Sequence, residues 1–210
     1  VTQYAAEGYL PDAMVNYLAR LGWSHGDDEI FSRAQFLEWF NLDHLGRSAA
    51  QFDEAKLRWV NAQHIKAMAG DALAPLVAAH LEQRGIAVDV RLPKLCDLLK
   101  DRCDTTVVLA DWVQRFYADV QPEADVLAQH VTDAIKPALT ALAAKLAVCT
   151  WDKAGINAAI KEVLAEAGIK MPQLAMPVRV LVLGTPQTPS LDAVLELLER
   201  EKVLGRLAKA

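Results

Sequence analysis

Apolar residues recur three and four positions apart along almost the whole chain. One such stripe is formed by Met14, Tyr17, Leu18 and Leu21. An α-helix brings these positions onto one face, whereas a half-buried strand would need strict alternation. The pattern therefore predicts an all-α fold, a multi-helix bundle of about nine or ten helices.

Capping residues and helix breakers predict the bounds of the first helices. Pro11 suits a first turn and Gly22 a stop, while Ser32 with Gln35 forms a capping box for a second helix. A third helix is expected to begin near Asp53. Further helices are expected over residues 71–84, 93–103 and 105–120.

The second half of the chain has the same helical period. An alanine-rich helix from Pro122 should kink or split at Pro137, because proline removes a backbone donor. Thr150 is the expected cap of the next helix, and Ser190 is the expected cap of one last helix. Residues 176–184 alternate valines as a strand would. A lone strand would have no partner, which favours a short buried helix.

Composition places the chain among soluble globular proteins. Apolar residues make up 53% and charged residues 23% of its 210 residues. The sequence has no run of about 18 apolar residues and no basic leader before an apolar stretch. We therefore expect a cytoplasmic protein without a membrane span. The formal net charge of −5 argues against a basic nucleic-acid coat, but a local basic surface is compatible with it.

No arrangement of reactive side chains points to a catalytic or metal site. The five histidines lack metal-ligand spacing, and His64 and His80 fall on apolar stripes that predict packing. The three cysteines form no close pair, and Cys96 and Cys103 lie two turns apart on one helix face, as expected of buried side chains. We expect no catalytic residue, no metal and no cofactor in this chain.

The most specific part of the sequence is the stretch GYLPDAMVNYLARLGWSHGDDEIFS, residues 8–32, continued by FNLDHLGRSAAQFDEAKLRWVNAQHI. It closely resembles the segment of bacterial glutamyl-tRNA synthetases, in the class I aminoacyl-tRNA synthetase family, that follows the catalytic Rossmann domain. The resemblance extends over essentially the whole chain. It implies the C-terminal region of a glutamate-tRNA ligase, whose full-length form attaches glutamate to tRNA(Glu) with ATP and Mg²⁺.

The resemblance also implies an organisation in three parts. Residues 1–69 would form a helical bridging (stem-contact) unit, and residues 70–147 and 148–210 two anticodon-binding subdomains. The implied partners are tRNA(Glu) and the enzyme's own catalytic domain, and we expect a monomer. Because the residues for ATP and glutamate chemistry are missing, this part would bind tRNA without catalysing the reaction.

A second match is the stretch LLKDRCDTTVVLADWVQRFY, residues 98–117, which resembles the family's Leu-x-x-x-Arg-x-x-x-Thr pattern. The resemblance aligns Arg102 with the arginine that reads the last anticodon base in discriminating enzymes. A guanidinium offers a fixed fork of donors to a base edge, whereas lysine offers a point charge. The alternative is a solvated residue that pairs with Asp101 or Asp104.

The third match is the closing stretch MPVRVLVLGTPQTPSLDAVLELLEREKVLGRL, residues 176–207. It resembles the family's end, in which the turn matching Thr188, Pro189, Ser190 and Leu191 contacts the first two anticodon bases. A helix N-terminus there would offer free amides, and Leu191 could stack under an unstacked base. The alternative is an ordinary linker with an N-cap. Ser190 and Glu199 stand where the family commonly has glycine, which leaves the loop shape and the helix packing open.

Six basic residues near these positions are candidates for contacts with the RNA backbone: Lys145, Lys153, Lys161, Arg179, Arg200 and Lys202. Most of them could equally pair with glutamates on the same helix. A rival interpretation of the chain is a helical protein-interaction scaffold without RNA binding, which its acidic net charge allows. An independent hydrolase ranks last, because no nucleophile and base form a pair.

Overall fold

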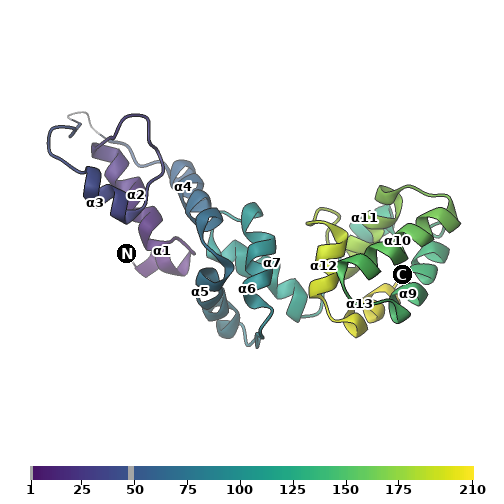
Figure 1. Ribbon diagram of the computed structural model, residues 1–210. Helices are drawn as coiled ribbons and strands as arrows, with labels where there is room; N and C mark the ends of the chain where they lie inside the picture. Colours follow the sequence, from purple (N-terminus) through teal and green to yellow (C-terminus); the bar gives the residue numbers. More distant parts are fainter. Residues whose placement is uncertain (1, 47–49) are drawn as a thin grey trace. The chain divides into compact units, whose positions relative to one another are not determined.

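The computed structural model describes residues 2–46 and 50–210, and within them the fold is helical (Figure 1). These ranges hold thirteen α-helices, one 3₁₀-helix, no named strand, and one isolated antiparallel bridge between Trp23 and Leu45. The predicted all-α class is confirmed. The helices outnumber the expected nine or ten because α1 (Thr2–Ala6) was not anticipated, the alanine-rich segment is divided into two helices, and the last helix is also divided.

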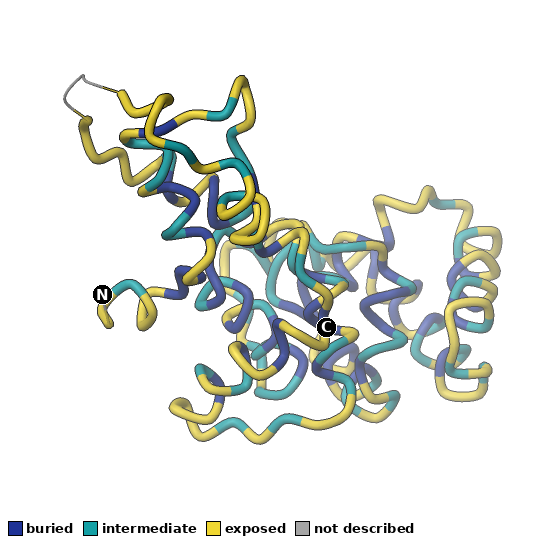
Figure 2. The backbone as a smooth tube through the Cα atoms, turned by 60° about the vertical axis from the view of Figure 1, so that its left-hand side comes forward, coloured by how far each residue is buried: buried dark blue, intermediate teal, exposed yellow. Residues whose placement is uncertain are grey.

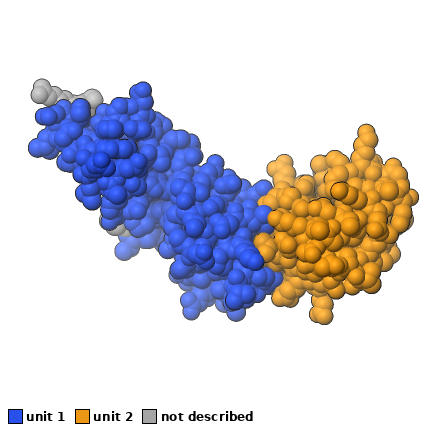
Figure 3. All heavy atoms as spheres, in the orientation of Figure 1, with its two compact units in different colours: residues 1–114 blue, residues 115–210 orange. Residues whose placement is uncertain are grey.

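The chain forms two compact units, which Figure 3 colours separately: unit 1, residues 1–114, and unit 2, residues 115–210. Unit 1 contains α1, α2 (Pro11–Gly22), α3 (Arg33–Trp39), α4 (Glu54–Ala67), α5 (Gly70–Gln83), α6 (Leu92–Leu99) and the 3₁₀-helix η1 (Lys100–Arg102). The boundary falls within α7 (Thr106–Tyr117). Unit 2 contains α8 (Ala124–His130), α9 (Lys136–Val148), α10 (Lys153–Ala167), α11 (Met171–Leu183), α12 (Leu191–Leu197) and α13 (Arg200–Leu207). The three-part functional division at residues 69 and 147 stays a prediction.

Local sequence signals set the helix ends in unit 1. The Ser32 hydroxyl accepts a hydrogen bond from the Gln35 backbone N–H at 3.2 Å, and the Gln35 side chain accepts one from the Ser32 N–H at 2.8 Å. This confirms the predicted capping box at α3. The Asp53 carboxylate accepts from the Lys56 N–H at 3.1 Å and caps α4, as expected. Gly85 follows α5 with a φ of 72°, a conformation that favours glycine.

Asn61 on α4 joins three segments of unit 1. Its side-chain oxygen accepts from the Leu10 N–H at 2.8 Å, and its side-chain nitrogen donates to the carbonyl oxygens of Gly8 at 3.2 Å and Asp104 at 2.6 Å. The Thr106 N–H also donates to the Gly8 carbonyl at 3.0 Å. Asn61 is fully buried, so these bonds satisfy groups that have no access to water. They fix the start of the chain against the loop after η1.

Helices α5 and α6 approach each other closely at Gly70. A Cβ atom on this residue would lie 2.0 Å from the Pro93 carbonyl oxygen. The Gly70 N–H, which begins α5, donates to the Asp97 carboxylate on α6 at 2.9 Å. Only glycine allows this contact, because any side chain would force the two helices apart.

The ambiguous valine-rich segment is helical. Residues 176–183 belong to α11, and Gly184 ends it with a φ of 77°. Figure 2 shows the contrast between buried and exposed stretches of the backbone. The buried residues of α11 are Leu174, Ala175, Pro177, Val178, Val180, Leu181, Val182 and Leu183. The expected buried helix is confirmed, since apolar character on most sides suits a helix inside a bundle.

Proline also divides the alanine-rich segment as predicted. Helix α8 ends at His130 and α9 begins at Lys136, which places Pro137 in the first turn of α9. Its missing N–H costs nothing there, because first-turn amides have no partner within the helix. Within the described residues, no helix combines the length and the apolar character needed to cross a membrane.

Two expected boundaries in unit 2 were wrong. The cap of α10 is Asp152, not Thr150, because the Asp152 carboxylate reaches the Gly155 N–H at 2.7 Å. The last helix is two helices, α12 and α13, which are separated by extended backbone at Leu198. Leu198 is buried, and its carbonyl accepts a hydrogen bond from the Trp151 indole at 3.0 Å. This tertiary bond satisfies a backbone group at the break.

Candidate nucleic-acid interface

Arg102 lies at the end of η1, in a short segment between two buried anchor points. Leu99, the last residue of α6, is fully buried, and so is Cys103, whose thiol donates to the Leu99 carbonyl at 3.3 Å. Lys100 donates to the Met68 carbonyl at 2.7 Å. The chain on both sides of Arg102 is thus fixed, while the Arg102 side chain is exposed.

The Arg102 guanidinium lies over the face of Trp112 on α7, with 5.0 Å between its carbon and the ring centroid. This separation is typical of a cation–π contact. Within the described part of the chain, Arg102 forms no ion pair with Asp101 or Asp104. Asp104 instead pairs with Arg58 at 3.2 Å. The alternative expected from the sequence, a solvated arginine paired with a neighbouring aspartate, is therefore not the observed arrangement.

The turn at residues 188–191 combines exposed and buried groups. Ser190 is exposed at the N-cap of α12, but its hydroxyl does not cap the helix. The Thr188 hydroxyl donates to the Pro189 carbonyl at 2.8 Å. Leu191 is only 5% exposed, so its side chain packs in unit 2 rather than facing solvent. Of the four predicted residues, Ser190 is the most accessible to a ligand.

Asp192 organises the first turn of α12. Burial by itself raises the pKa of its carboxyl, but hydrogen bonds from the Ser190 hydroxyl, the Ala193 N–H and the Asn157 amide outweigh burial and lower the pKa below its usual value. The Asn157 nitrogen lies 2.9 Å from the carboxylate. A charged Asp192 therefore fixes the Ser190 hydroxyl and joins the turn to α10.

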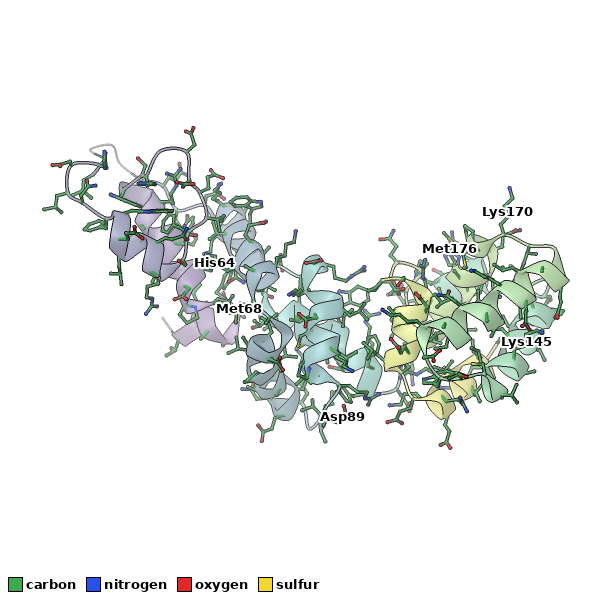
Figure 4. The ribbon with its side chains drawn as sticks, viewed as in Figure 1. His64, Met68, Asp89, Lys145, Lys170 and Met176 are labelled. Carbon is green, nitrogen blue, oxygen red and sulfur yellow. The ribbon has the colours of Figure 1, made fainter. Side chains whose placement is uncertain are left out.

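The six basic candidates differ in how far intramolecular contacts occupy them. Lys145, labelled in Figure 4, pairs with Glu162 and Glu166 of α10 at 2.9 Å each. Hydrogen bonds to Glu166 and Glu162 raise the pKa of Lys145. Lys153 and Lys161 are exposed on α10. Of these three, the two lysines on α10 are the more available to a phosphate.

The basic residues of α13 hold other helices in place. Lys202 donates to the carbonyls of Phe116 at 3.2 Å and Tyr117 at 3.0 Å, at the C-terminal end of α7. Arg200 lies over the Trp151 ring, 5.2 Å from its centroid, and donates to the Cys149 carbonyl. Both side chains therefore have structural contacts, and Arg179 on α11 is half-buried.

Arg206 is a buried cation that was not singled out from the sequence. It is 3% exposed and donates to the carbonyls of Arg115 at 2.9 Å and Ala118 at 2.6 Å, and also to Val182. Burial lowers its pKa, while Asp119 opposes that shift. Arg206 lies three residues after Val203 and therefore on the apolar stripe of α13. This helical spacing could have predicted that Arg206 is buried.

The corner at residues 22–28 is a rigid aromatic cluster. Trp23 is buried and packs edge-on against Phe31 and Phe36, with ring centroids 5.8 and 5.3 Å apart. His25 stacks on Trp39 at 4.2 Å and contacts the Asp28 carboxylate at 3.0 Å. This packing supports a structural role for the corner.

The other reactive side chains have structural surroundings. Burial raises the pKa of the Cys96 and Cys103 thiols to about 12 in each case, which leaves them unreactive near neutral pH. The His64 ring, labelled in Figure 4, donates to the Asn16 side chain at 2.9 Å, and His80 contacts a threonine hydroxyl at 3.0 Å. Burial lowers the pKa of both histidines. Residues 2–46 and 50–210 contain no metal-binding group of three or more such side chains.

Comparison with known proteins places this geometry in a family. Residues 56–210 match the family described as "Anticodon binding domain", and residues 1–59 match "tRNA synthetases class I (E and Q), catalytic domain". The second match shows that the first 59 residues, expected to follow the catalytic domain, are counted with it in that family.

The curated relatives are glutamate-tRNA ligases. The chain is 76% identical over 207 residues to the glutamate-tRNA ligase of Albidiferax ferrireducens, which covers 99% of the chain and 45% of that protein. It is 70% identical over 214 residues to the same ligase of Paracidovorax citrulli, and this match covers 100% of the chain and 45% of that protein. The chain thus spans about 45% of the length of these relatives.

A solved structure shares the fold. The crystal structure of a glutamate tRNA ligase from Elizabethkingia meningosepticum, in complex with its amino acid, matches with a TM-score of 0.90 at 23% identity. The match covers 98% of this chain and 42% of that chain. Because the "Anticodon binding domain" family matches residues 56–210, most of the chain, the chain belongs to that family.

Proposed function

We propose that this chain is the tRNA(Glu)-binding and anticodon-recognising part of a glutamate-tRNA ligase. The family match and the named relatives support this assignment. The whole protein would attach glutamate to its tRNA with ATP and Mg²⁺, and the chemistry would reside outside residues 1–210. This part would act by placing the RNA, since contacts far from the reacting atoms can favour a productive position of the acceptor end.

The observation that carries the proposal is the presentation of Arg102. Its guanidinium is exposed, lies over Trp112, and forms no ion pair within the described residues. An arginine in this state keeps its planar fork of N–H donors for an acceptor on another molecule. The last anticodon base is the acceptor that the family resemblance indicates.

Other residues would contact other parts of the tRNA. The turn at Thr188–Leu191 would meet the first two anticodon bases, with the exposed Ser190 foremost and Leu191 acting through its backbone. Lys153 and Lys161 are the exposed candidates for phosphate contacts. Residues 1–69 would bridge to the inner corner of the tRNA, and residues 70–147 and 148–210 would form the two anticodon-binding subdomains.

The proposal extends to the setting of the protein. We expect a monomeric cytoplasmic enzyme whose remaining part supplies the rest of the catalytic domain. Arginine rather than glutamine at position 102 favours discrimination against the glutamine anticodon.

The test measures the dissociation constant of the intact protein for glutamate tRNA and for the same tRNA with its last anticodon base changed to that of glutamine tRNA. The wild type should prefer the glutamate anticodon. Arg102→Ala should reduce this preference by roughly five- to 150-fold, since a bidentate contact with a base contributes about 1–3 kcal/mol of discrimination.

Arg33→Ala is the matched control, because Arg33 is also exposed in unit 1 but pairs with Asp12 at 2.9 Å. It should leave the preference unchanged. Equal affinity of the wild type for both tRNAs would show that this chain does not read the last anticodon base. Undetectable binding of both would favour a helical protein-interaction scaffold.

A further inference from the structure

Trp112 lies on α7 among residues that anchor this helix. On the same helix Leu109, Val113 and Phe116 are fully buried, and Trp112 itself is half-buried. Buried neighbours hold the backbone of α7 at Trp112. The Arg102 guanidinium lies 5.0 Å from the centroid of the Trp112 ring on this anchored helix.

The backbone that carries Arg102 is also held in place. The Cys103 N–H donates to the Lys100 carbonyl at 3.1 Å, and the Asn61 side chain holds the Asp104 carbonyl at 2.6 Å. With the backbone fixed on both sides, the remaining freedom of Arg102 lies in its side-chain torsions. The Trp112 contact restricts that freedom.

Three of the nearby carboxylates are paired with other cations. These ion pairs are Asp97–Lys100 at 3.0 Å, Asp104–Arg58 at 3.2 Å and Asp111–Arg84 at 2.8 Å. Among the residues that the structure describes, Arg102 forms no ion pair. Its donors are therefore not drawn toward an acidic side chain and stay available to an incoming base.

We propose that Trp112 is a positioning residue for anticodon recognition: its ring holds the Arg102 guanidinium in one orientation before the RNA binds. This inference rests on the base-reading role proposed for Arg102. Stacking on an aromatic face leaves the edge of the guanidinium plane free to donate. Restricting the side chain in advance lowers the entropic cost of binding the correct base.

The test measures the ratio of dissociation constants for the two tRNAs, those with the glutamate and the glutamine last anticodon base, using the intact protein. Trp112→Leu should lower the preference about two- to fivefold, the range expected for an exposed cation–π contact. Trp112→Phe should keep most of it, because phenylalanine also presents an aromatic face. If Trp112→Leu only destabilised the protein, the binding of both tRNAs would weaken alike and the ratio of their dissociation constants would not change.

Two further variants separate this role from others. Trp59→Leu is the matched control, because Trp59 stacks with Lys56 at 4.1 Å elsewhere in unit 1 and should not affect the ratio. In an Arg102→Ala background, Trp112→Leu should have no further effect on the ratio, since the residue it positions is gone.

The outcomes distinguish the inference from the proposed function. If Arg102→Ala lowers the preference and Trp112→Leu does not, the positioning role is refuted and the function of Arg102 stands. A Trp112→Leu effect that persists in the Arg102→Ala background also refutes it. If Arg102→Ala leaves the ratio unchanged, the base-reading role of Arg102 is wrong, and the inference fails with it.

Discussion

Replacing Arg206 with methionine should strongly destabilise unit 2. Methionine keeps an unbranched apolar stem but removes the donors that reach the carbonyls of Arg115, Ala118 and Val182. These carbonyls lie at or near the C-terminal ends of α7 and α11. The variant therefore leaves helix-end acceptors without their donor in a buried region.

The expected loss in the free energy of unfolding follows from two opposing contributions. Three hydrogen bonds from a charged donor contribute about 1.5–3 kcal/mol each, or roughly 5–9 kcal/mol in total. Burying a guanidinium costs several kcal/mol. The Arg206 Nε also makes no hydrogen bond within the described residues, which adds to that cost. The net loss in the free energy of unfolding should be about 2–4 kcal/mol.

Urea unfolding followed by circular dichroism measures this loss. For an m-value of about 2 kcal/mol per molar, the midpoint of the unit 2 transition should fall by roughly 1–2 M. The unfolding midpoint of Arg206→Lys should lie between those of the wild type and Arg206→Met, since one ammonium cannot reach all three carbonyls. Lys161→Met, a change on the exposed face of α10, is the control and should stay within about 0.5 kcal/mol. A loss below about 1 kcal/mol for Arg206→Met, with m unchanged, would refute the reasoning, because the hydrogen bonds would then only offset the burial of the charge.

Three further changes test the packing of unit 1. Asn61→Ala should cost about 3 kcal/mol by leaving the Leu10 N–H and the Asp104 carbonyl without their partner, while the Gly8 carbonyl keeps the Thr106 N–H; urea unfolding should show Asn61→Asp to be no less damaging, because a buried carboxylate would face the Gly8 and Asp104 carbonyl oxygens. Gly70→Ala should cost about 1–3 kcal/mol, because its Cβ would meet the Pro93 carbonyl; an unchanged melting temperature would contradict this. Burial holds the folded pKa of His64 below its ordinary value of 6.5, so its contribution to stability is present above that value and is lost as the pH falls through the folded pKa. Stability measured between about pH 7 and 5 should therefore decline with acid, and less steeply in His64→Gln.

Helix positions could be predicted from the sequence wherever a local signal sets them. The Ser32–Gln35 capping box, Asp53, Gly85 and Pro137 each act within a few residues of their own position. Their effects are backbone hydrogen bonds and torsion preferences, which sequence spacing encodes. These boundaries were confirmed for that reason.

One error came from a tertiary contact and the other from a choice between two neighbouring caps. The break at Leu198 has no glycine or proline within six residues on either side, and the Leu198 carbonyl is satisfied by Trp151, 47 positions away. Spacing along one helix cannot reveal such a partner. At α10, Thr150 and Asp152 are both good capping residues, and the observed geometry selected the carboxylate.

The sequence suggested Arg102 as a site residue, which stays a prediction, but it could not show the surroundings of this side chain. The family pattern aligned Arg102 with a base-reading arginine, and its exposure agrees with such a role. Its contact with Trp112 depends on the turn between η1 and α7. The structural contacts of Lys145, Arg200 and Lys202 likewise depend on neighbouring helices or loops that sequence spacing does not identify.

The central claim is that this chain binds tRNA through its anticodon. The most direct test measures the affinity of the intact protein for glutamate tRNA and for the same tRNA with an unrelated anticodon loop, over a series of salt concentrations. We predict that the loop change weakens binding at every salt concentration. The logarithm of the affinity should fall linearly with the logarithm of salt, because phosphate contacts release counterions. Equal affinity for the two RNAs, or binding that does not respond to salt, would contradict the claim.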